Sequence, residues 1–267
     1  MIENELTIRL TCFFGIFAVM ALWEVKSPRR PLSLSRKLRW SNNLGLIVVN
    51  SVLLRLFFPA AAVGFALQAE AKGWGLFNEV SLPTWIVVLC SIILLDLAIY
   101  WQHRLFHRIP MLWQYHQVHH ADLDYDVTTA TRFHPIEILL SMVIKMVAIT
   151  LIGAPALAVM LFEIILNGCA MFNHGNVQLP SAVDKIVRTF LVTPDMHRVH
   201  HSVVKSEHDS NYGFNLSIWD RLFGTYVAQP AAGHLGMKIG LDRFRDPKNQ
   251  MITALLRMPF SEKKAQK

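Results

Sequence analysis

Long apolar runs alternate with short polar segments over the first two thirds of the chain. A helix needs about 20 apolar residues to cross the hydrocarbon core of a bilayer. Four stretches are long enough to test, at residues 6–23, 44–67, 85–101 and 138–172. The last is too long for one span and is interrupted by Gly153-Ala154-Pro155, so we expect a helical hairpin there. The pattern predicts an all-α integral membrane protein with about four to five membrane-embedded helices.

Two charged residues lie inside the predicted hairpin. Lys145 and Glu163 are each nine residues from Ala154, on opposite arms and at matching depth. Ionisable residues within a membrane usually face a partner or the interior of the bundle. We therefore predict that Lys145 and Glu163 form an ion pair across the hairpin.

The distribution of basic residues predicts the orientation of these spans. Residues 26–43 hold six Lys and Arg, whereas residues 70–84 hold only Lys72. Because short cytoplasmic loops are enriched in Lys and Arg, the first of these loops is expected inside. Residues 102–135 and 174–267 then both face the cytoplasm, and together they contain all 12 histidines. We expect a cytoplasmic helical cap, and divide the chain into an N-terminal membrane region (1–84), a middle domain that holds most of the histidines (85–227) and a basic tail (228–267).

Composition agrees with a membrane protein. Of the 267 residues, 53% are hydrophobic and only 17% are charged, whereas about 25% are charged in soluble domains. These values also exclude a disordered chain. The three cysteines are odd in number and lack CxxC spacing, which argues against a disulfide-stapled secreted module. We expect no nucleic-acid partner.

The histidines form three boxes. His103 and His107 are four residues apart, and an HxxHH pattern occurs twice: His116, His119 and His120, and again His197, His200 and His201. Residues at i, i+3 and i+4 share one side of a helix, so each box can direct its imidazoles at a metal. A lone HxxxH is more often an ordinary polar pair. Eight imidazoles exceed the four to six ligands or so that one first-row ion takes, so we expect two ions.

Further residues extend the candidate site. His174 follows the hairpin and is a candidate ninth ligand, and His134 is a candidate additional ligand or a structural residue. His208 and His234 have no clustered partner and are expected to be solvated or structural. Asp96 lies on the helix face of the first box and could orient a ligand histidine from outside the coordination sphere. Asp195 and Asn211 are weaker candidates for the same role, with a solvated polar role as the alternative.

The ligand types restrict the metal. A histidine-rich site without clustered carboxylates or thiolates argues against Mg²⁺ and Ca²⁺, and leaves zinc, iron, copper and nickel. The zinc-protease pattern HExxH and the Glu-x-x-His pairs of soluble di-iron bundles are both missing from the sequence.

The order of these motifs resembles the fatty acid hydroxylase/sterol desaturase superfamily of membrane di-iron oxygenases. The resemblance covers roughly residues 85–227 and includes the stretch from Asn211 to Thr225 and the FHPxE sequence around His134. It implies that the eight boxed histidines bind two iron ions, which zinc can replace in purified protein. It also implies hydroxylation or desaturation of a sterol, fatty acyl or related lipid with O2.

Because no redox module is visible in the sequence, the resemblance implies a separate electron donor of the ferredoxin or cytochrome type. The short chain favours a multi-pass protein of the bacterial inner membrane, with its site on the cytoplasmic face. The alternative hypothesis is a histidine-rich membrane transporter or sensor of metal ions. Such a protein should place ionisable residues along a path through the membrane.

Overall fold

The computed structural model describes residues 2–261, and in this part of the chain it is all-helical. The membrane bundle and the first cap helix comprise α1 (Glu5–Lys26), α2 (Arg36–Phe57), α3 (Ala61–Ala71), α4 (Leu76–Glu79), α5 (Thr84–Arg108), α6 (Pro110–His120), α7 (Pro135–Ile152) and α8 (Ala156–Asn173). Within the described residues, five stretches are long and apolar enough to cross a membrane. The predicted all-α membrane architecture is confirmed.

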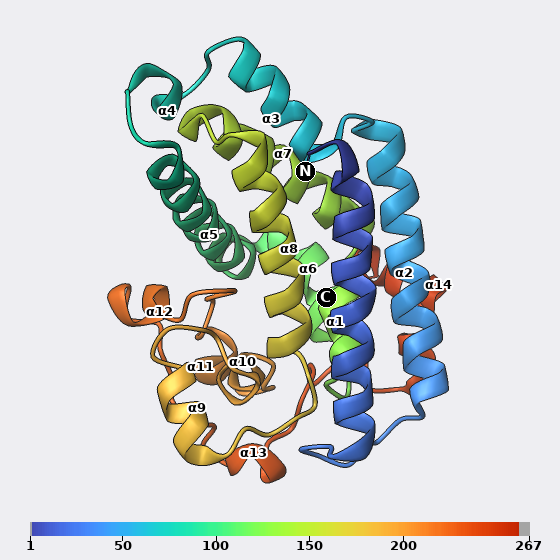
Figure 1. Ribbon diagram of the computed structural model, residues 1–267. Coiled ribbons are helices and arrows are strands. Elements are labelled where there is room, and N and C mark those ends of the chain that lie inside the picture. The colour runs from blue at the N-terminus through green and yellow to red at the C-terminus, as the bar shows by residue number, and fades with distance from the viewer. Residues whose placement is uncertain (1, 262–267) are drawn as a thin grey trace.

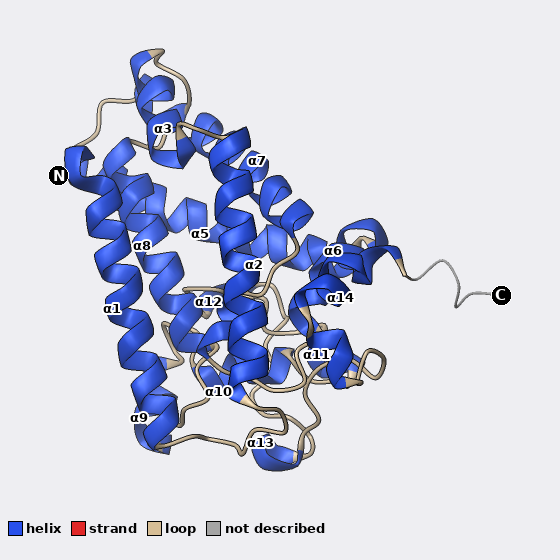
Figure 2. Cartoon of the chain, turned by 90° about the vertical axis from the view of Figure 1, so that its right-hand side faces the viewer, coloured by secondary structure: helices blue, strands red, loops and turns tan. Residues whose placement is uncertain are grey.

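The remaining elements are short and gather at one end of the bundle (Figure 1). They are α9 (Ser181–Val187), α10 (Pro194–His200), α11 (Lys205–His208), α12 (Ile218–Leu222), α13 (Gly233–Gly236) and α14 (Ile252–Arg257), with 3-10 turns η2 (Val127–Thr131), η3 (Pro247–Gln250) and η4 (Met258–Phe260). The 3-10 turn η1 (Ile2–Asn4) instead precedes α1 at the other end. Figure 2 shows the same division, with α3 at one end of the long helices and α13 at the other. The last six residues of the predicted tail lie outside the described range.

Residues 44–67 lie within one of these five stretches, but they do not form the single continuous helix that was predicted. Helix α2 ends at Phe57 and α3 begins at Ala61, because Pro59 has no backbone N–H and cannot continue the helix. After the break, α3 turns its small residues Ala62 and Ala66 toward α7 and α8. The third predicted span, at 85–101, instead continues to Arg108. This extension places His103 and His107 on the same helix as the span.

The hairpin is confirmed. Helix α7 ends at Ile152 and is capped by Gly153, whose φ of 71° is a left-handed conformation that glycine adopts without steric cost. Helix α8 starts after Pro155. The predicted pair is also present, with Lys145 Nζ 2.7 Å from Glu163 Oε1. Glu163 has a second partner that the sequence did not indicate, because Arg9 of α1 lies 2.9 Å from its other oxygen.

A buried ion network joins the N-terminal helices to the cap. Arg39 of α2 donates to both oxygens of Asp122, at 2.9 and 2.8 Å, and contacts Asp126, and none of these side chains is more than 1% exposed. Asp122 lies two residues after His120, the last residue of the second histidine box. Breaking such a buried pair costs about 3–5 kcal/mol. Residues of the first predicted region therefore hold the loop that leaves the candidate site.

Part of the predicted tail also packs on the bundle. Leu255 of α14 is fully buried against Leu46 of α2 and Val118 of α6. Both views place α14 beside α2 (Figures 1 and 2).

Candidate metal centre

Three helices bring the histidine boxes together. The last two turns of α5 carry His103 and His107, and α6 starts at once because Pro110 is favoured in a first helical turn. Helix α10 also begins with a proline, after Thr193, whose side chain accepts a hydrogen bond from the backbone N–H of Met196. A proline in the first turn therefore sets where α6 and α10, which carry the second and third boxes, begin.

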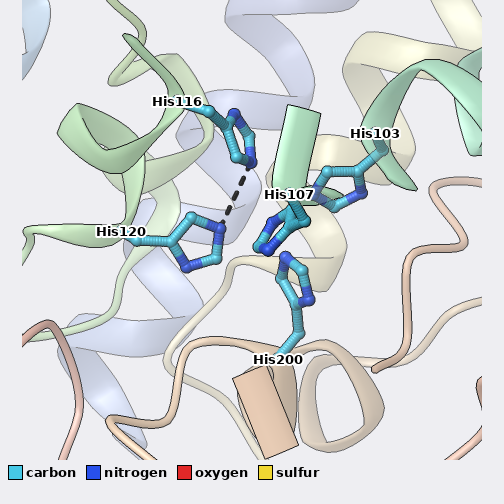
Figure 3. Close-up of side chains that lie close together, drawn as sticks. All are labelled: His103, His107, His116, His120 and His200. Atoms are coloured by element: carbon cyan, nitrogen blue, oxygen red, sulfur yellow. Dashed lines mark hydrogen bonds between the residues drawn. The ribbon is translucent and has the colours of Figure 1, made fainter. Parts of the chain in front are cut away.

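The histidines form two adjacent clusters, and within each of them the ligand atoms lie within 4.8 Å of one another. The five-histidine cluster consists of His103, His107, His116, His120 and His200 (Figure 3). The four-histidine cluster consists of His119, His174, His197 and His201. The rings of His120 and His201, one from each cluster, have centroids only 4.6 Å apart. The structure thus gathers all eight boxed histidines and His174.

Hydrogen bonds fix the direction of several rings. The Nδ1–H groups of His103, His174 and His200 donate to the carbonyl oxygens of Tyr212, Ala170 and Ser210, at 2.8, 2.8 and 2.6 Å. A carbonyl oxygen can only accept, so in each ring Nδ1 carries the proton and Nε2 keeps its lone pair. This is the tautomer that a histidine needs to bind a metal through Nε2.

At the centre of each cluster, ring nitrogens of neighbouring histidines lie within hydrogen-bond distance of one another, and a neutral ring has only one N–H to donate. Nε2 of His116 is 3.2 Å from Nε2 of His120, and Nε2 of His174 lies 3.1 and 3.2 Å from those of His119 and His197. Buried ring nitrogens with no partner among the described residues occur in His103, His107, His119, His120, His197, His200 and His201. Unsatisfied buried polar groups are costly, and a bound cation would satisfy one nitrogen of each ring that it contacts.

Burial keeps these rings neutral. Desolvation lowers the pKa of His116 to about 3 and that of His174 to about 3, and it depresses the pKa of His119 and His201 as well. Neutral imidazole is the form that binds metals. The residues therefore fit transition-metal ions, which prefer imidazole ligands over the oxygen ligands that Mg²⁺ and Ca²⁺ require.

Asp96 does not contact a cluster histidine. Its carboxylate accepts the backbone N–H groups of Asn215 and Leu216 and the indole N–H of Trp219, the last at 2.8 Å. The reason is distance along the helix, since seven residues separate Asp96 from His103, or about 10 Å at 1.5 Å per residue. Asp96 instead anchors the segment that follows the last box.

Asp195 and Asn211, the other two predicted supporting residues, also contact groups outside the histidine clusters. Asp195 lies near Arg29, Arg198 and His234, at 3.5 Å from the ring of His234, which is buried as a structural residue would be. Asn211, at a left-handed φ of 49°, donates to the carbonyl oxygens of Met196 and Val227. Neither has a cluster histidine among its hydrogen-bond partners.

His134 lies outside both clusters and begins α7. Its Nδ1 accepts the backbone N–H of Ile136 at 3.2 Å, as an N-cap does, and its Nε2 faces the carbonyl oxygen of Leu256 at 3.3 Å. Three residues later, Glu137 accepts a hydrogen bond from Nδ1 of His116 at 2.6 Å. Glu137 is therefore the carboxylate that orients a cluster histidine. The FHPxE sequence contained it, but spacing alone gave no sign of its partner.

The sequence shows no clustered partner for His208, but in the structure its ring lies beside the boxes. Its ring is nearly buried, and its centroid lies 4.5 Å from that of His120 and 4.9 Å from that of His107. The ring of Trp113 lies 4.8 Å from that of His208 and also neighbours those of His107 and His120.

The apolar surroundings of the clusters come from aromatic side chains. Phe133 stacks on His119 at 4.5 Å between centroids, and Phe214 lies about 6 Å from His103 and His197, one in each cluster. An open apolar groove of about 660 Å³ lies elsewhere, where Trp85 and Leu89 at the start of α5 meet Leu157. It is at the opposite end of α5 from His103 and His107.

Comparisons with known proteins agree with this site. The model of the fatty acid hydroxylase family matches residues 88–225. The chain is 31% identical over 148 residues to ornithine lipid hydroxylase OlsE of Rhizobium tropici, covering 55% of this chain and 44% of the relative. It is 31% identical over 197 residues to alkylglycerol monooxygenase of Xenopus tropicalis, covering 70% and 41%.

A third relative, human cholesterol 25-hydroxylase, is 25% identical over 140 residues, which cover 52% of this chain and 50% of the relative. The chain thus spans half or less of the length of these relatives. No solved structure matches it.

Proposed function

The chain belongs to the fatty acid hydroxylase family, and on this premise we propose that it is a membrane-bound di-iron oxygenase that hydroxylates a lipid. The observation that carries the proposal is the pair of adjacent buried clusters of five and four histidines. The relatives are named for the hydroxylation or monooxygenation of lipids, which favours hydroxylation over desaturation.

The nine clustered histidines would hold the two ions, each through one ring nitrogen. When bound, the irons supply the activation of O2, so that one oxygen atom enters the C–H bond and the other leaves as water, with two electrons and two protons consumed. Glu137 and the carbonyl oxygens of Tyr212, Ala170 and Ser210 hold the rings in place before any substrate arrives.

The surroundings of the clusters suit a lipid substrate. Phe214 touches both clusters and also packs on the apolar core between α1 and α8, around Met20 and Met171. A chain lying in the bilayer could meet the metals along this side, where apolar rings exclude water. Several lipid classes share this chemistry, and the proposed substrate is a membrane lipid.

The proposal also includes the side of the membrane on which the cap lies and the protein that supplies electrons. The six Lys and Arg of residues 26–43 favour a cytoplasmic position for the cap. In a bacterium the cap would lie on the cytoplasmic face of the inner membrane. Electrons would come from a separate ferredoxin- or cytochrome-type protein on that side.

The transporter or sensor hypothesis is not favoured. A transport path needs ionisable groups along the membrane, whereas the clusters lie together at one end of the bundle (Figure 1). Within the spans, Lys145 and Arg9 each form an ion pair with Glu163.

The test is lipid mass spectrometry of cells that express the full chain under ¹⁸O₂. We expect a lipid product that carries one labelled oxygen atom. The product should disappear in His119→Ala and in His200→Ala, which disable different clusters, and persist in the control His234→Gln. A product that survives both cluster variants, or one that lacks the label, would refute the proposal.

A further inference from the structure

The two clusters are enclosed on nearly every side, so a metal ion needs a route inward. The cluster side chains are nearly or fully buried. One edge differs, because a third group of possible ligands, His107, His208 and Asp209, has its ligand atoms within 4.8 Å of one another and includes a partly exposed carboxylate. We propose that these three residues form an entry site through which divalent transition-metal ions reach the five-histidine cluster. This inference rests on the metal centre of the proposed function.

His107 belongs to both groups and links them. Its ring is one of those that converge in Figure 3, and its Nδ1 lies 3.7 Å from Oδ1 of Asp209. Neither ring nitrogen of His107 has a hydrogen-bond partner among the described residues, although the side chain is fully buried. An imidazole that no hydrogen bond fixes can bind a cation on its outer side and pass it to the cluster on its inner side.

His208 is the third possible ligand of the entry site and lies beside the five-histidine cluster. Its ring packs among those of His107, His120 and Trp113, and the residue is 9% exposed. It follows the last histidine box by seven residues, on the short helix α11, and immediately precedes Asp209. The order of ligands from solvent inward is thus a carboxylate, an imidazole and the shared imidazole of His107.

This order matches what a hydrated cation requires. Asp209 is 23% exposed, and a carboxylate attracts a divalent ion that still carries its water shell. Imidazoles then replace water with ligands that transition metals prefer, whereas Mg²⁺ and Ca²⁺ do not. The site would therefore concentrate first-row transition metals at the edge of the cluster.

Lys205 covers the carboxylate without blocking it. Its Nζ is 2.5 Å from Oδ2 of Asp209, but its side chain is 86% exposed. Exposed ion pairs contribute about 0–1 kcal/mol, so an arriving divalent cation can displace the lysine.

The experiment measures the rate of metal loading. The full chain in detergent is stripped with a chelator, and Co²⁺ is added without oxygen while its ligand-field absorbance is followed by stopped flow. Elemental analysis then gives the final metal content. Asp209→Asn and His208→Gln should load about tenfold more slowly than the wild-type chain, because a charged entry site raises association rates by about tenfold or more. Both should reach the wild-type metal content.

Two further variants serve as controls. His234→Gln changes another buried histidine beside a carboxylate, that of Asp195, and should load at the wild-type rate. Lys205→Gln frees the Asp209 carboxylate and should load at least as fast as the wild-type chain. Asp209→Asn removes only a charge from a partly exposed side chain, so it carries the test even if His208→Gln does not fold.

The outcomes separate this inference from the proposed function. Loading of Asp209→Asn at the wild-type rate would overturn the entry site, as would a folded His208→Gln with a lower final metal content, which would make His208 a permanent ligand. Slower loading of Lys205→Gln would also overturn it. A wild-type chain that takes up no metal would refute the metal centre itself. Loading that follows the expected order in a chain that oxidises no lipid would leave the entry site supported and refute only the oxygenase function.

Discussion

Glu137 offers a way to perturb one of the two clusters and leave the other intact. Its Oε1 accepts the hydrogen bond from Nδ1 of His116 at 2.6 Å, and its other oxygen has no partner among the described residues. His116 presents its opposite nitrogen, Nε2, to His120 in the five-histidine cluster. The structure shows no hydrogen bond from Glu137 to the four-histidine cluster. We therefore expect substitutions of Glu137 to weaken metal binding at the five-histidine cluster alone.

The size of the effect follows from this hydrogen bond. A hydrogen bond to a charged group contributes about 1.5–3 kcal/mol, and losing the partner of a metal-bound histidine costs about 10–100-fold in metal affinity. At about 1.4 kcal/mol for each factor of ten, the two ranges agree. Glu137→Gln keeps an oxygen that can accept from His116 and loses only the charge, so we expect about tenfold weaker binding. Glu137→Ala removes the acceptor, and about 100-fold is expected.

The assay is an anaerobic titration of the metal-free chain with Co²⁺ in the presence of a competing chelator, which resolves the two binding steps. The control is Glu70→Gln, the same chemical change on the exposed side of α3. One binding step should weaken in the Glu137 variants and the other should stay at its wild-type value. Equal weakening of both steps, or no change in either, would refute the assignment of Glu137 to His116.

Three further predictions concern stability. Lys145→Met leaves Glu163 with Arg9 as its single cation and should cost up to about 3 kcal/mol, and adding Glu163→Gln should recover part of the lost melting temperature; a further drop would contradict the ion pair. His134→Ala should cost about 1 kcal/mol and His134→Asn much less, with metal content unchanged in both, whereas loss of metal in His134→Asn would make His134 a ligand. Because burial lowers the pKa of His116 from 6.5 to about 3, the unfolded chain binds the proton first, and the free energy of unfolding of the metal-free protein should fall as the pH drops from about 6.5 toward 3. Denaturant titrations at several pH values check this, and a constant free energy across that window would contradict it.

Features that depend on neighbouring residues in sequence were predicted well. The spans follow from apolar runs, the hairpin from Gly153 and Pro155, and the pairing of Lys145 with Glu163 from equal distances to one turn. Pro59 also indicates a helix break, but the apolar run continues on both sides of it and therefore predicted one span.

Contacts between distant segments could not be predicted in this way. Glu137 meets His116 because α7 packs beside α6, and His208 meets His120 because α11 folds back over the last box. For Asp96 the sequence suggested a contact that the structure does not contain. Asp96 shares a helix face with His103, but it lies two turns away and binds Trp219 instead. Periodicity gives the direction of a side chain around a helix, and it does not give the segment that will occupy that side.

The division of the HxxHH boxes follows from helix geometry once the two clusters are known to be adjacent. At about 100° per residue, the first and third histidines of a box point within about 40° of each other, while the second points about 60° to the other side of the first. His116 and His120 accordingly enter the five-histidine cluster, and His119 enters the other.

The last box divides in the same way with the clusters exchanged, because His197 and His201 enter the four-histidine cluster and His200 enters the five-histidine cluster. Each box thus supplies a pair to one cluster and lends its middle histidine to the other. A single helix can serve two ions only if they lie side by side, which is consistent with the 4.6 Å between the rings of His120 and His201. The repeated HxxHH spacing would therefore let two helices build the proposed two-metal centre, in which each middle histidine serves the cluster that the other box mainly supplies.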